Sequence, residues 1–353
     1  MDWKAFLKTL KKGEHLQSLV AFLAGSLIFG IIGWFTPPPA LVARYTGAVL
    51  FQTSNTSNYQ FIDPLLTCEI GSEEVFTDTR PMQKSLEAVI EKMVDTGTIE
   101  SASVYYRSLK TAHWFDINPT TTYAPASLLK VFVMMAYFKE SRDLNDPNLL
   151  LRQVPFQGSE NPARDDSPGA DIPHLVSGQM YSIDDLIKQM IVYSDNDALA
   201  TLTANFDPQT TTSLSEIFSD LRITSPLTDE KSYYMSVNQY SMVFRVLYNS
   251  TYLNRRLSEK ALTLLSQAAF RNGIVSGVPE GVSVAHKFGI TTIPAGTTTP
   301  ARAELHDCGI VYYPGHPYVL CVMTAGSSFP VLTDILKKLS ETAYAEQRKL
   351  YPG

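Results

Sequence analysis

The sequence is poor in cysteine and contains no long run of basic residues. Three cysteines occur in 353 residues, and they form neither a CxxC pair nor the dense pattern of a disulfide-stabilised domain. The net charge at neutral pH is −6, and the aromatic residues do not alternate with lysine or arginine. Because a nucleic-acid-binding surface needs clustered positive charge, we expect no nucleic-acid partner.

Histidine is also scarce, and its spacing does not match that of a metal site. The six histidines include no HxH or HExxH pair. His306-Asp307-Cys308 places three potential ligands together, but this triplet begins a predicted strand and lacks a partner motif. We therefore predict no metal and no cofactor. Internal repeats and low-complexity tracts are absent as well, which excludes a solenoid.

The longest hydrophobic stretch that lacks charge runs from Leu16 to Phe35. Its twenty residues are about the length that crosses a bilayer as a helix. Lysines outnumber acidic residues before it, so the positive-inside rule places residues 1–15 in the cytoplasm and the rest of the chain outside. We expect a single-pass anchor in the cell membrane. The alternatives are a cleaved signal peptide, whose apolar region is normally shorter, and a buried helix of a soluble domain.

The rest of the chain divides into a polar linker or stalk, residues 36–80, and one domain, residues 81–353. The domain opens with a helical pattern over Met82–Thr96, and two alternating patterns then predict a hairpin of strands, Ser101–Leu109 and Thr111–Ile117. A long helical region follows, and it is interrupted by a polar loop.

Strand patterns return near the end of the domain, over Val282–Phe288, Cys308–Tyr313 and Tyr318–Thr324, and a helix over Val331–Arg348 closes the chain. Strands at both ends of a helical middle predict an α+β fold, in which helices flank one antiparallel sheet and form a helical subdomain. Cys308 and Cys321 fall on facing strands, so a disulfide and two buried thiols are both compatible with the pattern.

One lysine interrupts the most apolar helix of the domain. Pro125 marks a helix start, and Ser127 falls at or beside the N-terminus of the helix. Lys130 lies one turn further on the same face, within a run from Ala126 to Phe138 that is otherwise uncharged. Burial there favours a neutral amine, which can accept the proton of a neighbouring serine hydroxyl. The alternative is a capping serine followed by an amphipathic lysine.

Two further motifs carry polar groups of use to catalysis. Tyr193-Ser194-Asp195-Asn196 lies in a predicted turn between helices, where Ser194 could relay protons and Asn196 could bind an amide; a simple connector is the alternative. His286-Lys287-Phe288-Gly289 ends a predicted strand, where Lys287 could attract a carboxylate and Gly289 would let a ligand lie against the edge. A solvated lysine on an edge strand is the alternative there.

In this order, the three motifs resemble those of the class A β-lactamases and related penicillin-recognising D,D-peptidases: SxxK, SDN and K-x-G. The resemblance covers about Met82 to Arg348 and implies the same α+β fold. It implies that Ser127 is the acylated nucleophile, Lys130 its general base and Ser194 the group that passes the proton to the leaving nitrogen.

The resemblance also implies three groups that bind substrate. Asn196 would hold the substrate amide and Lys287 the substrate carboxylate. The backbone N–H of Ser127 and one from the strand after Gly289 would form an oxyanion hole.

The sequence departs from the family pattern in two places. Phe288 stands where the family has a threonine or serine that helps to bind a carboxylate; Thr291 or Thr292 is a candidate replacement. The glutamate that activates the deacylating water, within an ExxLN stretch, is missing after the SDN motif. Glu230, in a short loop, is a candidate base, although a surface turn is the alternative role.

These features together predict a membrane-anchored serine hydrolase that forms an acyl-enzyme and hydrolyses β-lactam amides. The alternatives are a D,D-peptidase or penicillin-binding protein acting on cell-wall stem peptides, and a β-lactam sensor or wall-binding module without turnover. The expected partners are a β-lactam or a cell-wall peptide, and the membrane through Leu16–Phe35.

Overall fold

The computed structural model describes residues 59–64, 78–158, 174–225, 234–295 and 301–352. The predicted membrane segment Leu16–Phe35 and the candidate base Glu230 lie outside these ranges. Within them, no helix combines the length and apolarity needed to cross a bilayer. The chain divides into two units, Met1–Val49 and Leu50–Gly353, and the second contains all the described residues.

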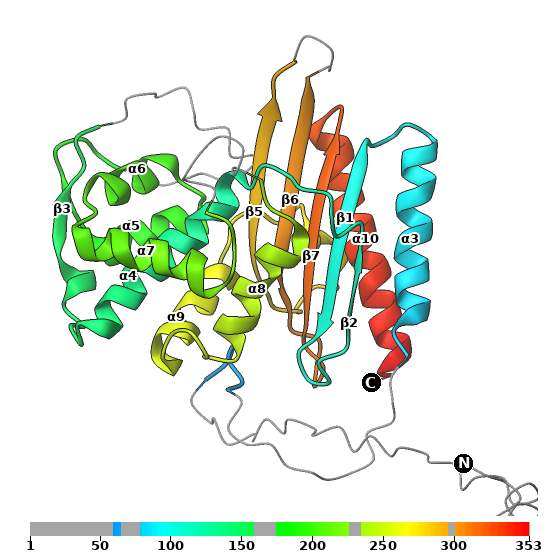
Figure 1. Cartoon of the computed structure of the whole chain (residues 1–353), viewed down its shortest axis with the longest axis horizontal. Helices are drawn as coiled ribbons and strands as arrows, with labels where there is room; N and C mark the ends of the chain where they lie inside the picture. The colour runs from blue at the N-terminus through cyan, green and yellow to red at the C-terminus, as the bar shows by residue number, and fades with distance from the viewer. Residues whose placement is uncertain (1–58, 65–77, 159–173, 226–233, 296–300, 353) are drawn as a thin grey trace, which may run out of the picture. The chain divides into compact units, whose positions relative to one another are not determined.

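A five-stranded antiparallel sheet forms the centre of the described fold (Figure 1). Its strands, in the spatial order β2-β1-β7-β6-β5, are Trp114–Ile117, Ser101–Ser108, Tyr318–Gly326, Arg302–Val311 and Val284–Ile293. Strands from the two ends of the domain therefore lie side by side, as the α+β prediction requires. β6 and β7 have almost no exposed residue because both faces of the sheet are covered.

Two long helices cover one face of the sheet. They are α3, Arg80–Asp95, and α10, Phe329–Leu350, which lie together on the right of Figure 1. Apolar residues recur at helical spacing on α10, from Leu332 to Ala343, and pack against β6, β7 and the short helix η4, Ile274–Gly277. This layer forms one of two hydrophobic clusters.

The second cluster lies on the opposite face and extends into a helical subdomain. The helices α8, Val237–Tyr248, and α9, Arg255–Ser266, contact the sheet directly. The remaining elements of the subdomain are η1 Ala126–Leu129, α4 Lys130–Asp143, η2 Leu149–Leu151, β3 Gln153–Pro155, β4 Met180–Ser182, α5 Ile183–Val192, α6 Asn196–Ala204 and α7 Pro208–Asp220.

Helix α4 lies in the middle of this subdomain and is covered on all sides. Every residue from Lys130 to Ser141 is buried, and the helix packs against α5, α7 and α9. Its near-continuous apolar sequence follows from this position, because a helix without a polar face must be surrounded. The predicted burial of Lys130 is confirmed, with an exposed fraction of 1%.

The strands of the hairpin at the end of the domain differ in length from the predicted ones. β6 begins at Arg302 rather than Cys308, because its polar residues are buried through side-chain contacts that the strand pattern does not reveal. β5 likewise continues past Phe288 to Ile293, so Lys287 lies within the strand rather than at its end. Cys308 and Cys321 face each other and are joined by a disulfide, which resolves the alternative left open by the sequence.

Six residues of the predicted stalk, 59–64, pack against the domain. The Glu259 carboxylate accepts hydrogen bonds from the backbone N–H groups of Gln60, Phe61 and Ile62, at 2.6 to 3.1 Å. Phe61 and Ile62 are buried, and the Tyr312 hydroxyl donates to the Phe61 carbonyl at 2.9 Å.

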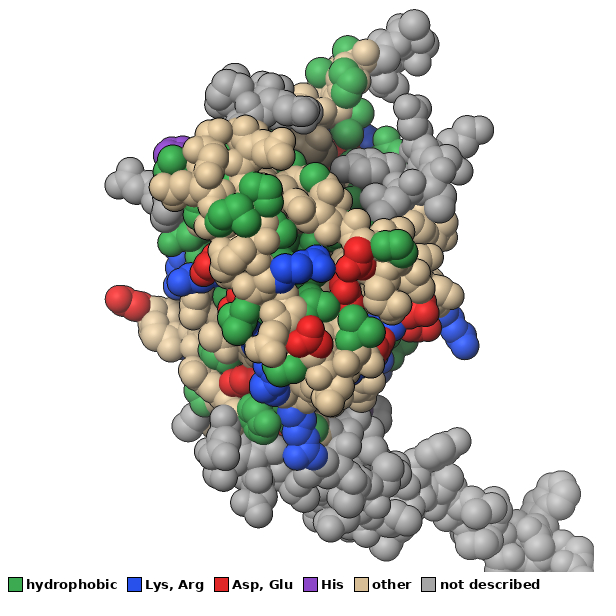
Figure 2. Space-filling view, turned by 90° about the vertical axis from the view of Figure 1, so that its left-hand side faces the viewer, with side chains coloured by type: hydrophobic (Ala, Val, Ile, Leu, Met, Phe, Trp, Pro, Cys, Tyr) green, Lys and Arg blue, Asp and Glu red, His purple; other side chains and the backbone are tan. Residues whose placement is uncertain are grey.

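Acidic and basic side chains are mixed on the outer face of the helical subdomain (Figure 2). Several of the partly exposed charges of this subdomain are paired, such as Arg142 with Asp143 and Arg152 with Asp207. Opposite charges at such short range cancel at a distance, so this face does not present a field of one sign.

Candidate active site

The SxxK motif spans a tight turn. Ala126–Leu129 is a 3₁₀ helix that runs directly into α4, so Ser127 and Lys130 are separated by one turn of three residues. Side chains at i and i+3 of such a turn project in the same direction. Ser127 is half-buried, whereas Lys130 is buried. The residue before the serine, Ala126, has φ +48°, a left-handed conformation that costs a non-glycine residue about 1–2 kcal/mol.

The SDN motif meets Lys130 at the end of α5. Lys130 Nζ donates to the Ser194 carbonyl, to Ser194 Oγ at 3.2 Å and to Asn196 Oδ1 at 2.8 Å. Ser194 has φ +60°, and this sharp turn directs both its carbonyl and its hydroxyl toward the lysine. Asp195 caps α6 through the Ala198 N–H and accepts from Gln189 at 3.0 Å, which fixes the turn.

Lys287 reaches the same serine from the sheet. Its Nζ donates to Ser194 Oγ at 2.8 Å and to the Phe288 carbonyl at 3.1 Å, and the side chain is completely buried. Burial, and then the nearby positive charge of Lys130, lower the pKa of Lys287 well below its usual range. The alternative of a solvated edge lysine is therefore wrong, because the helical subdomain covers this part of the strand.

The hydroxyl of Ser194 thus lies between two lysine amines. Its oxygen is 3.2 Å from Lys130 Nζ and 2.8 Å from Lys287 Nζ, so the amines are at most 6.0 Å apart. Two ammonium groups at this separation in a buried site repel each other, and the pair favours losing one proton. The arrangement provides a hydroxyl that can pass a proton between two amines.

Gly289 allows the sheet to approach the turn that carries Ser127. A Cβ atom at this position would lie 2.6 Å from the Pro125 carbonyl oxygen and 3.0 Å from Leu128 Cγ. Any other residue would therefore push β5 away from η1. The predicted site residues Ser127, Lys130, Ser194, Asn196, Lys287 and Gly289 consequently occupy one region, where η1, the α5–α6 turn and β5 meet.

Two buried residues beside this region were not predicted from the sequence. Glu304 and His306 on β6 hold the backbone of Ala124, through its N–H at 2.9 Å and its carbonyl at 3.0 Å. Burial raises the pKa of Glu304, but contacts with His306, the Ala124 N–H and Arg302 outweigh it, so the net pKa lies below the usual range. The sequence did contain a signal for them. Glu304 and His306 are two residues apart, which places both side chains on one face of a strand.

The departure at Phe288 is a packing feature. Phe288 lies in the cluster on the α10 side of the sheet and stacks on Phe270, with ring centroids 4.2 Å apart. Its ring also lies 4.3 Å from Lys287 Nζ. Residues two apart on a strand share a face of the sheet. Thr291 therefore lies on the same face as Lys287 and Gly289, whereas Thr292 lies on the opposite face. Of the two candidate replacements, Thr291 has the suitable position.

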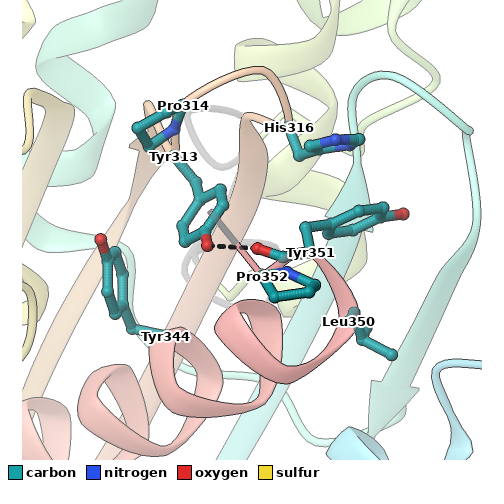
Figure 3. Close-up of a pocket in the computed structure, with 7 residues that line it drawn as sticks. All are labelled: Tyr313, Pro314, His316, Tyr344, Leu350, Tyr351 and Pro352. Atoms are coloured by element: carbon teal, nitrogen blue, oxygen red, sulfur yellow. Dashed lines mark hydrogen bonds between the residues drawn. The ribbon is translucent and has the colours of Figure 1, made fainter.

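A separate cavity of about 430 Å³ contains none of these groups (Figure 3). It lies beside the β6–β7 turn and the end of α10, and aromatic rings and prolines form its walls. His316 stacks on Tyr351 at 3.6 Å, and the Tyr313 hydroxyl donates to the Tyr351 carbonyl at 2.6 Å. This cavity provides no nucleophile with an adjacent base, so the lysine–serine region is the candidate active site.

Solved structures with the same fold are β-lactamases and a penicillin-binding protein. A β-lactamase of Sphaerobacter thermophilus is 18% identical with a TM-score of 0.61, covering 76% of this chain and 99% of that one. A representative of class A β-lactamase from Bacteroides cellulosilyticus is 17% identical with a TM-score of 0.61, covering 76% of this chain and 99% of that one. A point mutant of PBP-A, in an acyl-enzyme complex with penicillin G, is 17% identical with a TM-score of 0.60, covering 76% of this chain and 97% of that one. At sequence identities this low, the structural similarity shows a shared fold and nothing about activity.

The family itself is shown by the sequence. No curated protein matches the chain. The model of the β-lactamase enzyme family, however, matches residues 82–347, which is most of the chain and all three motifs. The chain therefore belongs to the β-lactamase enzyme family and is a serine hydrolase.

Proposed function

We propose that the protein reacts with β-lactams through an acyl-enzyme on Ser127 and hydrolyses their amide. One observation carries this proposal: the Ser194 hydroxyl contacts both lysine amines, one of which lies a single turn after Ser127. A serine one turn before a buried lysine, with a second hydroxyl as proton relay, provides the groups that acyl transfer needs.

The proposed reaction begins when Ser127 Oγ attacks the lactam carbonyl carbon. Lys130 accepts the hydroxyl proton, and the backbone N–H of Ser127 with one from the strand after Gly289 stabilises the oxyanion. When the C–N bond breaks, the proton passes from Lys130 through Ser194 to the leaving nitrogen. Water then adds to the ester carbonyl, and the bond to Ser127 Oγ breaks to give the free acid and the serine.

Two polar groups would orient the substrate. Asn196 would bind its side-chain amide, exchanging the hydrogen bond from Lys130 for one to the ligand. Lys287 would attract its carboxylate, and a bound anion would favour the charged form of this lysine. Thr291 is the candidate for the hydroxyl that Phe288 does not supply.

The second candidate is a D,D-peptidase or β-lactam sensor, which would keep the acyl group for much longer. The absence of an ExxLN glutamate after the SDN motif favours it, since in the family this residue activates the deacylating water. Glu230 would be the base for deacylation in the first case and would be dispensable in the second.

Incubation of the full chain with a fluorescent penicillin tests the proposal. We expect covalent label on the wild type and none on Ser127→Ala. Label on Ser127→Ala, or an unlabelled wild type, would refute the nucleophile. Label that decays while product accumulates beyond one equivalent supports a β-lactamase, whereas persistent label supports the second candidate.

The role of Glu230 is tested by the decay of the label. Glu230→Gln should slow deacylation at least about a hundredfold if this carboxylate activates water, because general-base catalysis contributes roughly 10²–10⁴-fold. Asp229→Asn is the matched control and should decay like the wild type. Equal decay in both variants would dismiss Glu230.

We also propose that Leu16–Phe35 anchors the protein in the cell membrane, with the hydrolase domain on the outer side. Support comes from the uncharged length of the segment and the lysines before it. Full-length protein should sediment with membranes and resist extraction at high pH, and external protease should digest the domain in cells whose outer layers are permeabilised. A protein recovered in the soluble fraction after cleavage near Phe35 would favour the signal peptide.

A further inference from the structure

We propose that Glu304 and His306 are positioning residues for acylation, which hold the turn that presents Ser127 by binding both polar groups of the Ala124 backbone. This inference rests on the proposed role of Ser127. It adds two residues from β6 to a site otherwise built from η1, α4, the α5–α6 turn and β5.

The two side chains reach Ala124 from the same face of the strand. Glu304 Oε2 accepts the Ala124 N–H at 2.9 Å, and His306 Nε2 lies 3.0 Å from the Ala124 carbonyl oxygen. Both side chains have an exposed fraction of 0%. A buried carboxylate and imidazole that hold the peptide groups on the two sides of the Ala124 Cα atom fix the position and orientation of this residue together.

The hydrogen-bond pattern assigns the roles of the two ring nitrogens of His306. The Thr324 backbone N–H donates to Nδ1 at 3.3 Å, so Nδ1 is an acceptor. The proton therefore resides on Nε2, which donates to the Ala124 carbonyl. Glu304 is held in turn, because Arg302 donates to its second oxygen at 2.8 Å and bonds Glu100 at 2.7 Å.

Ala124, which these contacts hold, comes two residues before a strained residue. Ala126 has φ +48°, and the preceding Pro125 has little freedom of its own. A left-handed alanine persists only where its surroundings leave no alternative. Ala124 is fixed on one side of Ala126, and on the other the Tyr240 hydroxyl donates to the Leu128 carbonyl at 3.0 Å. The strained residue and Ser127 thus lie between two fixed points.

Acylation kinetics of the full chain with a fluorescent penicillin test the inference. Glu304→Ala and His306→Ala should each lower the first-order acylation rate constant by about tenfold or more, because small misplacements of a nucleophile have large effects. The dissociation constant of the initial complex should stay within about twofold, since neither residue contacts the ligand site. Glu304→Gln and His306→Gln retain an acceptor and a donor and should recover most of the rate.

A matched control and a double mutant make the test specific. Glu100→Ala removes the outer partner of Arg302 and lies away from Ala124, and its acylation rate should equal that of the wild type. Ala126→Gly removes the conformational strain, so His306→Ala should cause a smaller loss in that background than in the wild type. If the alanine variants do not fold, His306→Phe keeps a ring against Tyr123 and removes the donor.

The outcomes separate this inference from the proposed function. Normal acylation by folded Glu304→Ala and His306→Ala, in a protein whose label still requires Ser127, would overturn the inference alone. A loss that is equally large with and without Ala126→Gly would also overturn it. A wild type that is never labelled on Ser127 would refute the proposed function, and the inference with it.

Discussion

Single residues determine the chemistry through the environment of two lysines. Lys130 and Lys287 come from different elements, yet both contact the hydroxyl of Ser194. Both side chains are buried, and burial penalises two positive charges held close together there. The pair is thus suited to hold one proton fewer than two exposed lysines would.

Lys130→Met should abolish most of the acylation. The variant keeps the apolar stem and removes the proposed base, so the rate with a fluorescent penicillin should fall by roughly 10²–10⁴-fold. Lys139→Met is the matched control, because Lys139 is also buried in α4 but pairs with Asp143 and Glu216 instead. It should retain acylation and lose about 1–3 kcal/mol of stability. Similar rates in the two variants would contradict the role of Lys130.

Lys287 should give the protein a pH-dependent stability. Its pKa is lowered by burial, so above the folded pKa and below about 10.4 the unfolded chain alone carries this proton. The free energy of unfolding then rises with pH in this window, by about 1.4 kcal/mol per unit at most, and falls on acidification. Lys287→Met should show a flatter profile in urea unfolding between about pH 7 and 9.5. Parallel profiles would show that the lysine is charged in the fold.

At the scale of elements, the site depends on how closely β5 approaches η1. The two elements touch where Gly289 faces Pro125 and Leu128, and this contact sets the distance between the sheet and Ser127. The α5–α6 turn supplies the third side, and the caps of Asp195 hold it in place.

Gly289→Ala should separate these two elements. The added methyl would meet the Pro125 carbonyl oxygen at 2.6 Å, so the strand must shift, which costs about 1–3 kcal/mol of stability. We expect acylation to slow by about tenfold or more because the oxyanion donors move with the strand. Thr292→Ala, an exposed position on the opposite face, is the control and should leave both quantities unchanged. A fully active Gly289→Ala protein would show that the contact is dispensable.

At the scale of the whole molecule, the domain extends further toward the N-terminus than residue 81. The carboxylate of Glu259 binds three successive N–H groups of residues 60–62, and Phe61 packs edge-on against Tyr312 at 5.3 Å. This segment is distant in sequence from α9 and from the residue that follows β6, and it contacts both.

Truncation should reveal this contribution. A chain that begins at residue 78 should unfold at lower urea concentration than one that begins at residue 59. Loss of the buried Phe61 and Ile62 side chains removes about 3–6 kcal/mol at most. Glu259→Gln in the longer chain should lower stability by about 1–3 kcal/mol, because a charged acceptor is lost. Equal stability of the two truncated chains would contradict the packing role.

The fold class and the family could be predicted from the sequence because they depend on local patterns. The helical period of α10 and the apolar runs of β6 and β7 predict the α+β architecture, and the spacing of SxxK is fixed by one turn of helix. The all-round apolarity of α4 predicted a covered helix and therefore the burial of Lys130. Each of these properties can be read from residues that are neighbours in the chain.

Other properties were decided by contacts between distant residues. Glu304 and His306 have the composition of an exposed strand end, and only their contacts with Ala124, about 180 residues earlier, make them buried. The pairing of Cys308 with Cys321 likewise follows from strand register. The sequence by itself determined the elements, the motifs and the family. Tertiary structure decided which polar groups are desolvated together, because that depends on partners brought close by folding.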